Sequence, residues 1–334
     1  MTEKKIVFSG IQPSGNLHLG NYLGAIKRWV ADQDRYDSIF CVVDMHAITL
    51  PQDPGVLRAN IRELMGLLVA CGIDPERSVL FVQSHVTAHA ELAWILNCVT
   101  PVGWLERMTQ YKEKAAKQDS VGTGLLDYPV LQAADILLYQ AHLVPVGEDQ
   151  RQHVELTRDI AGRFNYLYGE TFVLPEALIA TTGAKIMGLD DPTSKMSKSD
   201  EKRYHAIGIL DEPDEIRAAV RRAVTDSGRE IIFSDNPEKA GVHNLLTIYQ
   251  LLSGQSEEEI EDHFSGKGYG NLKREVAEIV IEALRPIQRR YQELAEDPAT
   301  IDDLMRAGAE EAGRRSAPTL RTVKERVGFL LPNA

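Results

Sequence analysis

The sequence is poor in cysteine, and its few cysteines follow no pattern. Cys41, Cys71 and Cys98 are odd in number, lie far apart and include no CxxC spacing. A disulfide framework and a thiolate metal site both need regular spacing, so neither is indicated. We expect buried thiols.

Long hydrophobic runs and an excess of positive charge are also missing. No apolar stretch approaches the ~18 residues of a membrane-spanning helix, and the amino end MTEKKIVFSG lacks the apolar core of a signal peptide. We therefore expect a cytoplasmic protein with no membrane partner. The formal net charge of -12 argues against indiscriminate binding to nucleic acid, although a local basic patch can still hold phosphates.

The first half of the chain alternates short apolar runs with amphipathic segments. The runs KKIVFSG, SIFCVVD, SVLFVQS and HLVPVG are rich in Val, Ile and Phe and end at Gly, Ser or Asp, which predicts buried strands. The segment between the second and third runs predicts a helix that ends near Gly72. This alternation predicts an α/β fold with a mostly parallel sheet and a ligand site beyond the carboxyl ends of its strands.

Beyond about residue 205 helical patterns dominate. They cover residues 214–224, 244–252, 257–264, 273–294 and the chain from 301 onward. We expect a catalytic domain over 1–205, a smaller all-helical domain over 206–290, and a carboxyl-terminal helical segment over 291–334 that can pack back on the first domain.

The first predicted strand runs directly into SGIQPSGNLHLGNYLGA, a strand, turn and helix that can hold phosphate at the helix start. The turn contains neither GxxxxGK[ST] nor GxGxxG, so a P-loop ATPase and a dinucleotide dehydrogenase lose their main support. His18 and Asn21 share a helix face, and Gly20 lets a base or a ribose approach the backbone. The alternative is an ordinary corner with a capping Asn.

The stretch KMSKS, residues 195–199, places two lysines around a small hydroxyl among Gly and Pro residues (GLDDPTSKMSKSD). Such a segment is typical of a loop that closes over a substrate, and the alternative is a solvated lysine loop. Together, HxGN and KMSKS are the signature of class I aminoacyl-tRNA synthetases. The stretches FSGIQPSG, GNYLGA, VDMHAIT, LLDYPVLQAADILLYQ, VPVGEDQ and RAVTDS resemble the bacterial tryptophanyl-tRNA synthetases, in order, with thinner similarity beyond about residue 275.

The resemblance implies a Rossmann-like catalytic domain that activates L-tryptophan with ATP and then transfers it to the 3′ end of tRNA(Trp). Negative charge builds on the departing pyrophosphate, which flexible lysines can follow and stabilise. The resemblance also implies catalytic roles for Gln12, His18, Asn21, Lys114, Lys195 and Lys198. Mg²⁺ would arrive on ATP, with no dedicated metal ligands in the protein. The implied ATP contacts are Gln12, Pro13, Ser14, Gly20, Asn21, Gly147, Glu148, Asp149, Ile186, Lys195, Met196, Ser197, Lys198 and Ser199.

Substrate choice is assigned by the resemblance to Asp135, which accepts the indole N–H. A lone carboxylate in an apolar helix is costly to bury unless it is hydrogen-bonded, and its alternative role is a contact to a neighbouring loop. Tyr128 and Gln150 reach the α-ammonium group, and Phe8, His46, Val144 and Val146 form the walls. Gln132 departs from the family, which carries a methionine here. This departure reopens the question whether the substrate is tyrosine.

One pair of histidines has a spacing that could place both on one helix face, as a metal site needs. His85 and His89 lie four residues apart, but no third ligand is near, so we expect surface or capping roles.

Two other functions compete with tryptophan activation: a tyrosyl-tRNA synthetase, and a non-catalytic nucleotide-binding paralogue that kept the scaffold. The family implies a homodimer and a tRNA partner. A set of basic residues in the helical segments could face the tRNA, or could be a solvated helix face. These are Arg221, Arg222, Arg314, Arg315, Arg321, Lys324 and Arg326.

Overall fold

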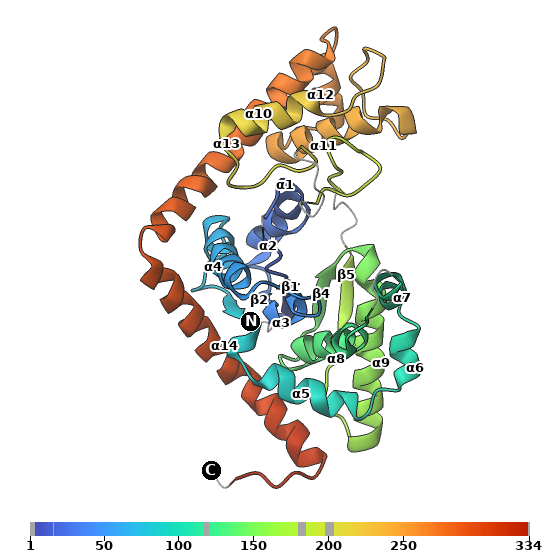
Figure 1. Cartoon of the computed structure of the whole chain (residues 1–334), viewed down its shortest axis with the longest axis vertical. Helices are drawn as coiled ribbons and strands as arrows, with labels where there is room; N and C mark the ends of the chain where they lie inside the picture. The colour runs from blue at the N-terminus through green and yellow to red at the C-terminus, as the bar shows by residue number, and fades with distance from the viewer. Residues whose placement is uncertain (1–3, 16, 117–119, 180–184, 198–203, 333–334) are drawn as a thin grey trace.

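The computed structural model describes residues 4–15, 17–116, 120–179, 185–197 and 204–332. At its centre lies a parallel sheet of five strands in the order β3-β2-β1-β4-β5 (Figure 1). The strands are β1 Ile6–Ile11, β2 Asp37–Val42, β3 Val79–Val82, β4 Leu143–Val146 and β5 Glu176–Ile179. The predicted α/β class is confirmed.

Alternating side chains of the sheet enter two separate cores. On β2 and β3, Phe40 and Leu80 belong to the core that includes α4, whereas Ile39 and Phe81 belong to the core that includes α5, α8 and α9. Both faces of the sheet are therefore covered, as a parallel sheet requires. Figure 1 shows α2 and α4 on one side of the strands and α8 and α9 on the other.

Helix α4 of the first half begins and ends where the sequence provides caps. Asp53 accepts the backbone N–H groups of Gly55 and Val56 at the start of α4, and Gly72 follows its end with φ +110°. The α-helices are α1 Leu19–Asn21, α2 Lys27–Asp32, α3 Asp44–Ala47, α4 Pro54–Ala70, α5 Ala88–Asn97, α6 Val102–Glu106, α7 Thr109–Ala115, α8 Thr123–Leu137 and α9 Arg151–Tyr168. A π-helical turn (η1, Tyr22–Ile26) and two short 3₁₀ helices (η2, Gln83–His85; η3, Glu148–Gln150) complete this half.

The second half is helical over the described residues beyond 204. Its helices are α10 Pro213–Arg222, a 3₁₀ turn (η4, Pro237–Lys239), α11 Ala240–Ser253, α12 Glu257–Phe264, α13 Tyr269–Ala295 and α14 Pro298–Arg326. In Figure 1, α13 and α14 run in sequence along one side of the molecule. The expected boundary after residue 290 falls inside α13. The helical structure is interrupted only at residues 296–297, between α13 and α14.

The last helix, α14, covers the edge strand β3. A side chain at Gly308 would overlap the carbonyl oxygen of Leu80, so only glycine allows this close approach. Arg315 donates to both carboxylate oxygens of Asp37 at 2.8 Å, which ties α14 to β2. Covering β3 removes an exposed sheet edge that could pair with another chain.

Most of the basic residues considered for tRNA have protein partners. On α14, Arg315 bonds Asp37 and Lys324 bonds Glu91, while the others pair with neighbours on their own helix or with the backbone. Arg222 lies over the ring of Tyr204. Arg315, Lys324 and Arg326 therefore tie α14 to the rest of the protein, whereas Arg314 and Arg321 pair within the helix.

Two expectations about isolated features have different outcomes. Cys41 and Cys71 are buried as expected, but Cys98 is exposed at the end of α5, so the expectation of a third buried thiol was wrong. Within the part of the chain that the structure describes, no helix combines the length and the apolar character needed to cross a bilayer.

Candidate active site

The main cavity opens at the carboxyl ends of β1 and β4, where the strand order reverses. This switch point is the usual ligand site of an open parallel sheet. The cavity volume of about 330 Å³ suits a small molecule. All the side chains predicted to bind the amino acid line it: Phe8, His46, Tyr128, Gln132, Asp135, Val144, Val146 and Gln150.

Asp135, on α8, is the buried acidic group of this cavity and is only 1% exposed. Its Oδ2 lies 2.8 Å from His46 Nε2, and its Oδ1 lies 2.6 Å from both Gln83 Nε2 and His89 Nδ1. Burial alone would raise the pKa of Asp135, but the hydrogen bonds from His46 and His89 outweigh it and hold the pKa below its usual value. A buried, ionised acceptor therefore stands in the cavity wall.

A second polar group of this cavity is the hydroxyl of Tyr128, also on α8. It lies 2.8 Å from His153 Nε2 and donates to Gln110 Oε1 at 3.3 Å, and burial raises the pKa of Tyr128 to about 12. Burial, together with the charge of Lys114, lowers the pKa of His153 to about 4, so this imidazole is neutral. The Tyr128 hydroxyl is thus held in the cavity wall by two neighbours.

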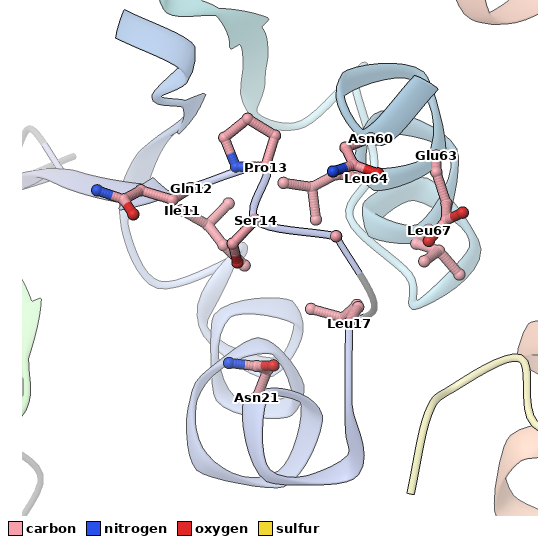
Figure 2. Close-up of a pocket in the computed structure, with 11 residues that line it drawn as sticks. Ile11, Gln12, Pro13, Ser14, Leu17, Asn21, Asn60, Glu63, Leu64 and Leu67 are labelled. Carbon is pink, nitrogen blue, oxygen red and sulfur yellow. The ribbon is translucent and has the colours of Figure 1, made fainter. Parts of the chain in front are cut away.

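A second, smaller cavity of about 40 Å³ lies between the loop after β1 and α4. Figure 2 shows Pro13 and Ser14 in this loop, with Asn21 on one side and Asn60 of α4 on the other. Gln12 lines both this cavity and the main one. The predicted nucleotide loop is thus adjacent to the predicted amino-acid pocket.

The two signature stretches meet at Gly20. A Cβ atom there would lie 3.0 Å from His18 Nδ1 and 3.3 Å from Met196 Cβ. His18 and Met196 therefore both lie close to Gly20. Asn21 accepts the backbone N–H of His18 at 3.2 Å, which is the capping role considered as an alternative.

The residues around KMSKS form a short paired turn. The backbone N–H of Met196 donates to Ile186, and that of Gly188 donates to Ser194, so both Ile186 and Met196 are fixed and buried. Lys195 is exposed and Ser197 half-buried. Lys198 and Ser199 lie outside the described residues.

The remaining predicted phosphate and nucleotide residues lie on α7 and in the segment that follows β4. Lys114 of α7 lines the cavity and places its Nζ 5.1 Å from the ring centre of Tyr128. Gly147, Glu148 and Asp149 follow β4 and are exposed. Arg151 pairs with Glu148 at 2.8 Å.

Comparisons with known proteins match this arrangement along the whole chain. A family model described as class I tRNA synthetases (W and Y) covers residues 1–285. A tryptophan–tRNA ligase of Wolinella succinogenes is 56% identical over 328 residues, which are 98% of this chain and 99% of that one. Among solved structures, the tryptophanyl-tRNA synthetase of Mycoplasma pneumoniae has a TM-score of 0.90 at 35% identity over 98% of each chain. That of Campylobacter jejuni, complexed with ADP and tryptophan, has a TM-score of 0.84 at 37% identity over 97% of this chain and 100% of that one.

The chain belongs to the class I tRNA synthetases for tryptophan and tyrosine. This membership confirms the resemblance to bacterial tryptophanyl-tRNA synthetases, and with it the Rossmann-like fold, the aminoacyl-tRNA ligase class and the tryptophan–tRNA ligase activity.

One expectation about this class I tRNA synthetase was wrong. His89 is neither a surface residue nor a cap: it is fully buried in α5 and bonds Asp135, whereas His85 is exposed. The sequence held a signal for this, because His89 is spaced three, four and seven residues before Leu92, Ala93 and Leu96, which are all buried.

Other synthetase residues around the cavity were not predicted. Gly10, Val43, Gln110, Pro145 and Ile136 also line it, and Gln83 and His153 bond its polar groups from behind. Their positions depend on which strand ends become neighbours, and no local pattern reports that.

Proposed function

We propose that L-tryptophan binds in the main cavity with its indole N–H on Asp135. The observation that carries this is the buried, ionised carboxylate in a cavity whose apolar walls include Phe8, Val144 and Val146. An aromatic ring without an N–H would leave this acceptor unpaired, which is a costly loss in a buried site. Tyr128 and Gln150 hold the α-ammonium group, and Gln132 contacts the ring.

The nucleotide takes the adjoining space. ATP lies along Gln12, Pro13 and Ser14, next to the second cavity, and extends toward the exposed residues after β4. We propose for ATP the same residues that the resemblance implies. Besides the loop after β1 and the lysines, these are Gly20, Asn21, Gly147, Glu148, Asp149, Ile186, Met196, Ser197 and Ser199. Mg²⁺ arrives on the phosphates, whose oxygens it prefers.

The chemistry then follows from this placement. A carboxylate oxygen of tryptophan attacks the α-phosphorus of ATP, the bond to the bridging oxygen breaks, and pyrophosphate leaves with the electron pair. Lys195, Lys198 and Lys114 stabilise the charge that develops on pyrophosphate. Gln12, His18 and Asn21 hold the nucleotide for attack. In the second step a hydroxyl at the 3′ end of tRNA(Trp) attacks the carbonyl of the adenylate, and AMP leaves.

The same proposal covers the assembly and its setting. We assign residues 1–205 to catalysis, 206–290 to the tRNA anticodon region and 291–334 to a segment that braces the catalytic part. The enzyme works in the cytoplasm as a homodimer, and the exposed Trp94 of α5 and Val102 of α6 are the apolar side chains that we assign to its interface. A single sedimenting species of dimer mass that becomes a monomer in Trp94→Glu would support this; a wild-type monomer would contradict it.

The experiment that tests the function is ATP–pyrophosphate exchange with each amino acid in turn, without tRNA. Exchange with tryptophan alone is expected. Exchange with tyrosine would mean that the cavity around Gln132 admits a phenol, and no exchange with any amino acid would support a non-catalytic paralogue. For the second step, the Michaelis constant for tRNA should rise steeply with salt, because phosphate contacts release counterions.

A further inference from the structure

The carboxylate of Asp135 is held from behind the cavity by two residues that do not line it. Gln83 and His89 are each 0% exposed, and both reach Oδ1 at 2.6 Å. His46, which does line the cavity, reaches the other oxygen, Oδ2, at 2.8 Å. The two oxygens of the carboxylate therefore have different surroundings.

The proton positions around His89 follow from its partners. An ionised carboxylate only accepts, so Nδ1 of His89 carries the hydrogen that is donated to Asp135. The other ring nitrogen, Nε2, lies 2.8 Å from the hydroxyl of Tyr139, so the ring is held at both nitrogens. Burial raises the pKa of Tyr139 far above its usual value, so this hydroxyl keeps its proton. The orientation of the His89 ring is thereby fixed.

Gln83 is oriented in a similar way. Its Oε1 accepts the backbone N–H of Met45 at 3.1 Å, so its Nε2 is the end that faces Asp135. The ring of His89 is in turn enclosed by the rings of Phe81 and Tyr139, with centroids 5.5 and 5.6 Å away. Neither donor can turn away from the carboxylate without breaking another buried contact.

The count of acceptor positions then gives the functional consequence. A carboxylate has about four lone-pair sites, two on each oxygen. Gln83 and His89 occupy both sites on Oδ1, and His46 occupies one on Oδ2. We propose that His89 and Gln83 are positioning residues, which lock the Asp135 carboxylate so that one acceptor site, on Oδ2, is left for the N–H of an aromatic ring. This inference rests on the proposed function, in which Asp135 accepts the indole N–H.

The test compares tryptophan with β-(benzothiophen-3-yl)alanine, in which sulfur replaces the indole N–H. In His89→Leu, kcat/KM for tryptophan in ATP–pyrophosphate exchange should fall by about 10- to 100-fold, mostly through KM, because a buried hydrogen-bond network loses a member. The analogue makes no such bond, so its kcat/KM should change by less than about threefold. The preference for tryptophan over the analogue should therefore fall by at least about threefold, and by tenfold or more where the analogue is unaffected.

Three further variants separate positioning from simple support of the fold. His89→Asn keeps an N–H near the position of Nδ1 and should restore most of the preference. Gln83→Met removes the other donor to Oδ1 at similar side-chain volume. It should lower the preference for tryptophan over the analogue by about tenfold. Tyr139→Phe removes one oxygen and should lower the preference for tryptophan by about two- to fivefold because the His89 ring loses its contact at Nε2.

The outcomes distinguish the positioning role of His89 and Gln83 from the proposed role of Asp135. Equal losses for tryptophan and the analogue in His89→Leu, or an unchanged preference in all the variants, would overturn the positioning role while leaving the proposed function intact. If the wild-type enzyme itself does not prefer tryptophan over the sulfur analogue, the role of Asp135 in the proposed function fails instead.

Discussion

The two sides of the active site are built in opposite ways. At the amino-acid side, Asp135 is 1% exposed, is bonded by His46, Gln83 and His89, and sits on the long helix α8. At the phosphate side, Lys114 and Lys195 are exposed and stand on a short helix and a turn.

This difference matches what each side has to do. Discrimination between aromatic rings requires an acceptor that cannot move, since any rotation would accommodate the wrong ring. Pyrophosphate moves as it leaves, and a lysine on a long stem can follow it. Selection and rate acceleration are thus assigned to separate groups, and substitutions should separate them.

The largest effect is expected at the phosphate side. Lys195→Ala should lower the rate of tryptophan activation by about 10²- to 10³-fold, as for loss of one group that acts in the transition state. Lys198→Ala should behave alike, and the KM for tryptophan should stay nearly unchanged in both. Steady-state exchange kinetics measure this, and a raised KM with unchanged turnover would assign these lysines to ground-state binding.

At the amino-acid side the pattern should reverse. Asp135→Asn places an amide group among donors that need an acceptor, so kcat/KM for tryptophan should fall by about 10²-fold, mainly through KM. The KM for ATP should change little. If kcat fell alone while KM for tryptophan held, Asp135 would act in the chemical step and the division between the two sides would be wrong.

The behaviour of His153 predicts a pH effect on stability. Between pH 6.5 and about 4 the unfolded chain binds a proton at His153 that the folded chain does not, so stability falls as the pH is lowered through this window. Partial solvation of the site reduces the loss to about 2 kcal/mol.

Urea unfolding of wild type and His153→Gln at pH 6.5 and pH 4.5 measures this loss. The difference between the two proteins isolates the contribution of His153 from that of other groups. The variant should show the flatter dependence, and parallel curves would show that His153 is protonated in the fold.

The smallest effect is expected at Gln132, which lines the cavity. Gln132→Met exchanges side chains of similar length and adds an apolar surface, so the KM for tryptophan should fall by about two- to fivefold. Tyrosine should remain inactive in exchange. Activation of tyrosine by the wild type but not by the variant would make Gln132 a determinant of a broader specificity.

How far the sequence could predict this structure depends on whether the signal was local. The first four strands are apolar runs with clear ends and were recognised, whereas β5 reads EALI and is exposed at its start, so it was not. Helix α14 could be predicted from its period, but its docking against β3 depends on Gly308, which no period reports.

The residues of the functional site also differ in whether a local sequence signal reports them. The pocket residues were found through resemblance, and the structure gathers them in one cavity. The network behind Asp135 was missed because its members lie 89, 52 and 46 residues from it in the chain, at His46, Gln83 and His89. The spacing of His89 from His85 fits a metal site, but its spacing from Leu92 and Leu96 indicates burial.

The most direct test of the division between selection and rate is calorimetric titration of tryptophan, without ATP, into Lys195→Ala and Asp135→Asn. The account predicts that Lys195→Ala binds tryptophan within about twofold of the wild-type Kd, while Asp135→Asn binds about 10²-fold more weakly. Wild-type affinity in Asp135→Asn, or a tenfold or greater loss in Lys195→Ala, would contradict it.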